Sequence, residues 1–417
     1  MFQAPPREGP LGSWLVLGAW VAVVYGSIPL ARRILRVVDS YWGTYKLRWL
    51  ALAIIALSAL IALVSVYRRF HRLPWDRLLW LSGLVGVFIY LVLTKLKQPS
   101  EALHFVQYGL LGLLAFRAVS HHVPDRLAYG CAFVLCLLVG TVDEILQWIT
   151  PGRFWDVRDI LHNGVAAALA QVALVGGLRP AFIKPGISPR SVRWFGALAS
   201  ALLLLWGLCA SNTPVAMDWY TDRIPGLAFL RAQDDAMCEY GYRYEDPDLG
   251  RVYSRFARED LLALDQARAG DSGPVIAHYI ESNTYRDFLL RYTPATDAFT
   301  HEAMVHLHRR NHYNGVLPKY VDQPDLLKRH ATVAYRENQI LERYFPLTLE
   351  FSGQQWPVGR ADELKPLLRT DRRYKSEVSS HLITRLSERQ IWYIIWLLLA
   401  LNVGWVLLKG RGSARVA

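Results

Sequence analysis

Cysteine is scarce in this chain, and its scarcity excludes one class of fold. Four cysteines occur in 417 residues, which is too few for a small scaffold held together by disulfides. Cys131 and Cys136 lie inside an apolar run, where we expect them to be small packing residues. Cys209 and Cys238 flank the start of a polar stretch. The sequence leaves open whether these two form a disulfide.

Several familiar signatures are also missing. The sequence contains no Walker phosphate loop, no Rossmann glycine pattern and no nucleophile elbow. It has no motif that combines basic and aromatic residues as nucleic-acid-binding proteins do. We therefore expect no cofactor and no nucleic-acid partner. No cleavable signal peptide is visible, so we expect the first apolar run to stay in the mature protein.

Long apolar runs are abundant. Hydrophobic residues make up 53% of the chain and the mean hydropathy is +0.15, which is high for a soluble protein. A bilayer core of about 30 Å needs about 20 apolar residues per helix. Such runs predict about eight spans, at 14–31, 49–67, 78–96, 103–119, 127–149, 157–178, 194–210 and 390–408. The expected fold is all-α, a polytopic helical membrane bundle, and membrane lipids are its expected partners.

One long polar segment, 211–389, interrupts the apolar runs and predicts a mostly helical soluble domain between spans seven and eight. We expect five regions: N-terminal spans at 1–77, a membrane domain at 78–178, a seventh span within 179–210, the soluble domain at 211–389, and a last span and tail at 390–417. The soluble segment is close to neutral, so the net charge of +12 lies in the membrane part. Basic loops there fit anionic lipid headgroups better than nucleic acid.

The distribution of basic residues predicts the orientation. Placing both termini in the cytoplasm puts more Lys and Arg inside than outside, as the positive-inside rule requires, and places the soluble domain outside a plasma (inner) membrane. The loop 32–48 is basic and would face the wrong way. It is either an interfacial helix that follows an atypical first span, or the topology is shifted by one helix.

Helical periodicity covers most of the soluble segment. We predict helices from Ser254 as an N-cap, and over 274–291, 298–312, 324–345 and 361–369. The stretches 239–250 and 347–359 are typical of loops or short strands. From Ser376 the pattern predicts one long helix that continues into the last span.

Ionisable side chains gather between two apolar runs, in DEILQWITPGRFWDVRDILHN at 143–163. Charges inside a span cost about 2.5–3.5 kcal/mol each on the insertion scale, so this cluster requires polar surroundings. Spacings of three and four residues place the acids on one face of each of two helices, and Pro151-Gly152 predicts a turn between them. His104 and Tyr108 form an i, i+4 pair on an earlier span. Together these elements predict a polar pocket lined by His104, Tyr108, Asp143, Glu144, Gln147, Arg153, Asp156, Asp159 and Asn163.

These residues resemble the VanZ-like family over about residues 78–178. That family carries an HF-two-residues-Y segment, here His104-Phe105 with Tyr108, an acidic helix end with a Gln, a P-G-R turn and a D-…-N helix start. Two positions depart from the family pattern, because Glu101 stands where Lys is common and Ala166 where Gly is common. The resemblance implies a multi-pass envelope protein associated, in the family's namesake, with resistance to the glycopeptide teicoplanin. It supplies no reaction and does not extend to the soluble domain.

Two functions from different classes follow. The first is a non-catalytic scaffold or binding protein for a cell-envelope protein or lipid-linked glycan, with the charged hairpin bracing the bundle. The second is an enzyme or carrier acting on a lipid-linked phosphate or sugar, with Arg153 clamping phosphate and Asp143, Glu144 or His104 as acid or base. The sequence does not decide whether the protein is an enzyme.

A histidine-rich stretch, HEAMVHLHRRNHY, is similar to a zinc signature but has one residue too many. His301 and His306 are five apart and therefore lie on different faces of a helix. His301, His308 and His312 share a face and form a weak metal candidate. An amphipathic helix with solvated or paired histidines is the better interpretation, so we expect no metal site.

Overall fold

The computed structural model describes residues 9–41, 43, 46–71, 74–94, 99–232 and 236–411. Parts of four predicted regions lie outside these ranges. They are residues 1–8, 42, 44–45 and 72–73 of the N-terminal spans, residues 95–98 of the membrane domain, residues 233–235 of the soluble domain and residues 412–417 of the tail. The chain divides into two compact units. The membrane unit comprises residues 1–207 and 394–417, and the insert unit comprises residues 208–393.

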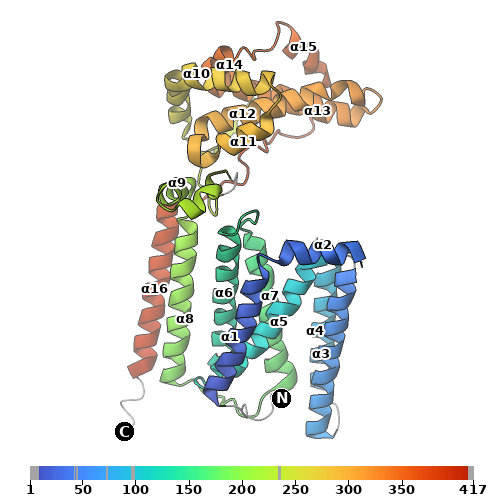
Figure 1. Ribbon diagram of the computed structural model, residues 1–417, viewed down its shortest axis with the longest axis vertical. Helices are drawn as coiled ribbons and strands as arrows, with labels where there is room; N and C mark the ends of the chain where they lie inside the picture. Colours follow the sequence, from blue (N-terminus) through green and yellow to red (C-terminus); the bar gives the residue numbers. More distant parts are fainter. Residues whose placement is uncertain are drawn as a thin grey trace. The chain divides into compact units, whose positions relative to one another are not determined.

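The membrane unit is built from apolar helices, because a helix satisfies its own backbone polar groups where no water is present. Its elements are α1 (Pro10–Ser27), α2 (Ala31–Tyr41), α3 (Lys46–Phe70), α4 (Trp75–Thr94), α5 (Pro99–Val119), α6 (Leu127–Trp148), α7 (Val157–Val172), the π-helical turn η1 (Ala173–Leu178) and most of α8 (Pro189–Ala210) and α16 (Glu388–Arg411). The last residues of α8 and the first residues of α16 belong to the insert unit. Successive spanning helices run in opposite directions, so α1 begins and α16 ends at the same end of the bundle (Figure 1).

Seven helices in the described part of the chain are long and apolar enough to cross a membrane. They are α1, α3, α4, α6, α7 continued by η1, α8 and α16. The fourth predicted span corresponds to α5, in which the described apolar stretch is the shorter His104–Val119. The all-α membrane fold is thus confirmed.

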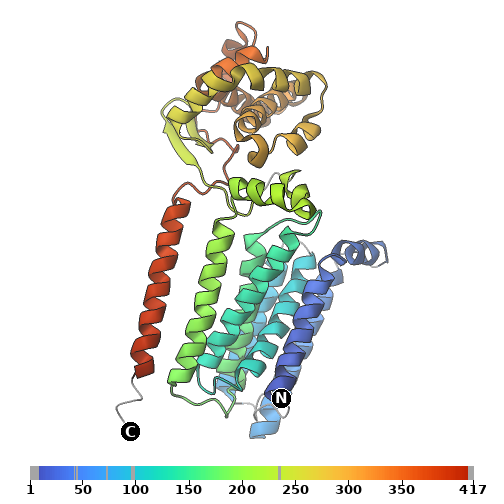
Figure 2. The ribbon, with the colours of Figure 1, turned by 60° about the vertical axis from the view of Figure 1, so that its left-hand side comes forward.

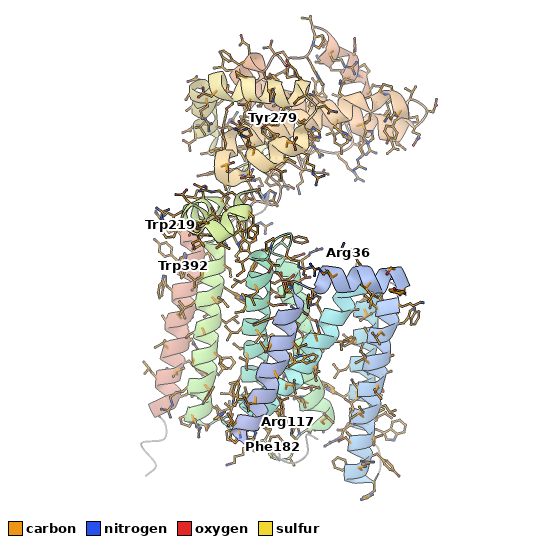
Figure 3. The ribbon with its side chains drawn as sticks, viewed as in Figure 1. Arg36, Arg117, Phe182, Trp219, Tyr279 and Trp392 are labelled. Atoms are coloured by element: carbon orange, nitrogen blue, oxygen red, sulfur yellow. The ribbon has the colours of Figure 1, made fainter. Side chains whose placement is uncertain are left out.

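The basic loop after the first span contains a separate helix. In α2, Arg33, Arg36 and Ser40 fall on one side of the helical wheel, and the apolar positions Val37, Val38 and Tyr41 fall on the other. Figure 1 shows α2 lying crosswise at one end of α3 and α4, and Figure 2 shows it projecting from the end of α1, with Arg36 labelled in Figure 3. An amphipathic helix of this kind suits the plane of a membrane interface.

Helix α5 lies at the centre of the membrane unit. It packs against α1, α3, α6 and α7, and its Phe105, Tyr108 and Phe116 are almost fully buried. Gln171 donates its side-chain N–H to the carbonyl of Gly112 at 2.8 Å. The central helix is therefore held on several sides by close packing, which is what drives helix association in lipid.

The insert unit is mostly helical around one small hairpin. Strands β1 (Tyr242–Asp246) and β2 (Gly250–Ser254) pair antiparallel, with Tyr244 opposite Val252. The other elements are α9 (Pro214–Arg223), η2 (Pro225–Ala232), α10 (Arg258–Glu281), α11 (Tyr285–Arg291), α12 (Pro294–Gly315), η3 (Leu317–Tyr320), α13 (Pro324–Tyr344), α14 (Pro346–Phe351), α15 (Arg360–Leu364) and η4 (Lys365–Leu367). Helices α12 and α13 pack together over a core that includes Phe299, Leu307 and Ile340.

Three local predictions for this unit are wrong. Ser254 ends β2 and is not an N-cap, and α10 begins after Ala257. Residues 346–351 are helical, because Pro346 opens α14 and Asp265 accepts backbone N–H bonds from Leu347 and Thr348. Residues from Ser376 to Ser387 do not extend α16. They exchange backbone hydrogen bonds with the hairpin region instead, through Ser376 N–H to Arg251 O at 2.9 Å and Ile383 N–H to Glu239 O at 2.8 Å.

Candidate functional site

The candidate site lies where α6 ends and α7 begins. Helix α6 stops at Trp148, and the chain turns through Pro151-Gly152, where Gly152 adopts a φ of 76°. That backbone conformation favours glycine. Helix α7 starts at Val157, and Asp156 is its N-cap, accepting the N–H of Arg158 at 2.8 Å. Asp156 therefore precedes the helix on which we had placed it, because its carboxylate caps the first turn.

Glu144 joins the two helices directly. Its Oε2 accepts the backbone N–H of Asp156 at 3.1 Å, and its Oε1 accepts the side-chain N–H of Gln147 at 2.5 Å. The Arg153 guanidinium in turn donates to Oε1 of Gln147. Glu144 is only 1% exposed. Both oxygens of this buried carboxylate are thus satisfied by groups of the same hairpin.

Asp143 faces the central helix. Its Oδ2 accepts the Tyr108 hydroxyl of α5 at 3.1 Å, and both residues are buried. Gly140, one turn earlier on α6, makes room for this contact. A Cβ at Gly140 would lie 3.3 Å from the Tyr108 ring and 3.6 Å from the Asn163 Cβ. The missing side chain lets α5, α6 and α7 approach one another at this level.

The remaining predicted residues lie around this cluster. Asn163 is 3% exposed and belongs to the α7 face that meets Gly140. His104 is half-buried on α5, one turn before Tyr108, and lies within electrostatic range of Arg153. Asp159 is half-buried on α7, with its Oδ1 4.0 Å from Nδ1 of His162. The hydrogen-bonded set is therefore Tyr108, Asp143, Glu144, Gln147, Arg153 and Asp156, and the other three residues flank it.

Two contributors come from helices that we had not assigned to the site. The Tyr25 hydroxyl of α1 donates to the carbonyl of Val139 at 2.9 Å, and the Trp206 indole of α8 donates to the Thr141 hydroxyl at 3.0 Å. Both side chains carry a polar group on an aromatic body inside an apolar span. Such residues usually find a partner when buried, and that signal could have identified them.

Some buried acceptors in the site have no hydrogen-bond partner in the described part of the chain. These are Oδ1 of Asp143 and Oδ1 of Asn163. The indole N–H of Trp155 is a buried donor that also has no partner there. A buried polar group without a partner costs about 1–3 kcal/mol. The site can therefore accept a proton, a water molecule or a ligand donor at Asp143 and Asn163. Both oxygens of Glu144 already accept hydrogen bonds from Asp156 and Gln147.

The histidine-rich stretch forms part of α12, and its histidines have different environments. Nδ1 of His301 contacts the carbonyl of Tyr292 at 2.7 Å, and the His308 ring stacks on Tyr285 with centroids 3.5 Å apart. His312 is exposed one turn further on. Across the described ranges, no group of three or more His, Cys, Asp or Glu side chains is placed to hold a metal ion.

Part of the chain matches a known family. Residues 53–176 match the model of the VanZ/LLP1 family, which covers α5, α6, α7 and the candidate site. The insert unit lies outside the matched residues. No curated protein and no solved structure matches the chain.

Proposed function

We propose that this protein, which carries a VanZ-like segment inside a multi-span membrane bundle, is a non-catalytic scaffold of the cell envelope. In this proposal the charged hairpin braces α5, α6 and α7, and the insert unit binds an envelope protein or a lipid-linked glycan. The supporting observation is that Glu144 uses both carboxylate oxygens within its own hairpin. A carboxylate that is committed in this way fixes helix register and is not available as a catalytic acid or base.

The proposal includes an orientation. Both termini lie in the cytoplasm, and the insert unit and the α6–α7 turn lie outside the plasma membrane. The amphipathic helix α2 supports this, because it accounts for the basic residues that otherwise conflict with the positive-inside rule. A link to glycopeptide susceptibility is part of the same proposal and rests on the VanZ resemblance.

A second candidate function is supported by a separate observation. The unpartnered Oδ1 atoms of Asp143 and Asn163 suit hydroxyl donors of a lipid-linked sugar or phosphate carrier. An enzyme or carrier would use these acceptors, whereas a scaffold would need only the Tyr108 contact.

The Asp143→Asn variant separates the two functions. Asparagine keeps an acceptor for Tyr108, so we expect the bundle to fold, and it removes the carboxylate that a reaction would need. The scaffold proposal predicts unchanged accumulation, unchanged lipid-linked glycan retained in native mass spectra and unchanged glycopeptide susceptibility. Asp76→Asn is the matched control, because Asp76 pairs with Arg179 outside the site. Loss of glycan or altered susceptibility in Asp143→Asn alone, with normal accumulation, would favour the carrier or enzyme.

A further inference from the structure

Two of the four cysteines come from distant parts of the sequence and lie near each other in the insert unit. Cys209 is at the end of α8 and is 7% exposed. Cys238 follows η2 and is half-buried. The other two, Cys131 and Cys136, are buried in α6.

The backbone holds the Cys238 segment beside the end of α8. The N–H of Cys238 donates to the carbonyl of Asn212 at 3.3 Å, and the N–H of Asn212 donates to the carbonyl of Cys209 at 3.1 Å. The Tyr240 hydroxyl donates to the carbonyl of Ala210 at 2.7 Å. Segment 238–240 therefore runs along the single turn that contains Cys209.

The surroundings keep both sides of this contact in place. The indole N–H of Trp392, labelled in Figure 3, donates to the Ser211 hydroxyl at 2.7 Å. On the other side of the segment, the N–H of Gly241 donates to the carbonyl of Ile383 at 3.1 Å. These contacts oppose separation of Cys238 from the α8 end.

A disulfide joins Cα atoms that are about 4.4–6.8 Å apart. Two hydrogen bonds in succession, from Cys238 N–H to Asn212 O and from Asn212 N–H to Cys209 O, place the Cys238 backbone beside the turn that follows Cys209. The two thiols lie within electrostatic range of each other.

We propose that Cys209 and Cys238 are a disulfide-forming pair that fastens the Cys238 segment to the end of α8. The oxidant is a disulfide, such as oxidised glutathione or a protein disulfide, which accepts two electrons from the two cysteines. The Cys238 thiolate attacks the oxidant, forms a mixed disulfide and releases one thiol. The Cys209 thiolate then attacks Cys238 Sγ, which forms the internal disulfide and releases the second thiol. The protein loses two protons and two electrons, and the oxidant gains them.

The order of attack follows from exposure. Cys238 is the more accessible thiol, so it meets the oxidant first, and buried Cys209 completes the exchange. Burial raises the pKa of the Cys238 thiol, with the nearby Glu388 acting in the same direction. We therefore expect the first step to accelerate as pH rises, because only the thiolate reacts. The finished link closes a loop that contains α9 and η2.

The test uses the full-length protein in detergent, treated with oxidised glutathione and mapped by mass spectrometry without reduction. We expect the wild-type chain to yield a peptide containing Cys209 joined to one containing Cys238, without retained glutathione. Cys209→Ser should trap one glutathione on Cys238, because nothing resolves the mixed disulfide. Cys238→Ser should show no adduct on Cys209. Cys131 and Cys136 serve as internal controls and should stay reduced.

Two results would overturn the proposal. Glutathione retained on Cys238 in the wild-type chain would show that the sulfurs cannot meet. An unmodified Cys238 in protein that still unfolds at its normal temperature would show that the thiol is inaccessible. The wild-type measurement decides the question even if a serine variant fails to fold, and neither result depends on the envelope-scaffold proposal.

Discussion

At the scale of single residues, the adjacent acids Asp143 and Glu144 have different hydrogen-bond partners. The sequence pattern predicts the same polar pocket for both. Glu144 accepts one hydrogen bond on each oxygen, from Asp156 and Gln147. Asp143 accepts a hydrogen bond from Tyr108 on Oδ2. A helical repeat shows that both acids lie near one face, but it cannot tell which oxygen will meet a donor from another helix.

Replacing these acids by their amides should therefore have unequal effects. Glu144→Gln turns one acceptor into a donor that faces another N–H, so we expect a loss of about 1–3 kcal/mol in stability. Asp143→Asn keeps the acceptor for Tyr108 and should lose less. Thermal unfolding of both variants in detergent measures the difference. Equal melting temperatures for the two variants would contradict this assignment of hydrogen bonds.

The insert unit also contains a buried acid, Glu337. Its carboxylate has more hydrogen-bond partners than that of Glu144. Glu337 is fully buried and contacts Nδ1 of His306 at 2.5 Å, the Tyr374 hydroxyl at 2.5 Å and the Ser376 hydroxyl at 2.9 Å. Removing one partner of a buried ion pair costs about 3–5 kcal/mol. We expect Glu337→Gln to lower the denaturation midpoint strongly. Glu363→Gln is the control, because its pair with Arg360 is solvent-exposed and worth less than about 1 kcal/mol.

Acid should destabilise the insert unit for the same reason. Burial by itself would raise the pKa of Glu337, but His306, Tyr374 and Arg309 hold it below its ordinary value. A pKa that is lower in the folded state than in the unfolded state adds stability above the unfolded value, near pH 4, and that stability is lost as the pH falls through the folded value. Burial would likewise raise the pKa of Asp297, but its hydrogen bonds and its pair with Arg268 hold that pKa below its ordinary value, so it contributes in the same direction. Circular dichroism melts between neutral pH and about pH 3 should show a progressive fall, and a flat profile would exclude this coupling.

At the scale of elements, helix contacts depend on small residues at particular positions of α5. A Cβ at Gly112 would lie 3.1 Å from the Ala170 Cβ and 3.2 Å from the Gln171 amide nitrogen. Gly109, three residues earlier, has nothing within 4 Å of such a Cβ. We expect Gly112→Leu to separate α5 from α7 and to cost about 1–3 kcal/mol, whereas Gly109→Leu should be tolerated. Accumulation and melting of the two variants provide the measurement.

The elements also show how far sequence patterns reach. Hydropathy located the spanning helices, and spacing placed Asp143, Glu144 and Gln147 together, because both signals are local. The ends of the helices and strands in the insert unit were harder to predict from the sequence. Ser254 looks like a helix cap in sequence, yet its hydroxyl accepts the N–H of Phe256 at the end of a strand. Likewise, residues 376–387 have a helical pattern, but non-local backbone bonds to the hairpin region override it.

At the scale of the whole molecule, the proposed orientation exposes one end of the bundle to reagents outside the cell and the other end to the cytoplasm. Pro151 lies in the exposed α6–α7 turn, and Gly186 lies in the exposed connection before α8. In a background without Cys238, we expect Pro151→Cys to react with a membrane-impermeant maleimide in intact cells. Gly186→Cys should react only after permeabilisation. The reverse pattern would invert the topology.

The bond from Glu144 to the backbone of Asp156 also has a consequence for biogenesis. Helix α6 entering lipid alone would expose two acids for which hydrocarbon offers no donor. The groups that satisfy Glu144 are Gln147 at the end of α6 and the backbone N–H of Asp156, the N-cap of α7. We therefore expect the insertion machinery to release these two helices as a pair, once synthesis has passed the start of α7. A reporter segment that ends before residue 156 should insert less completely than one that continues through α7.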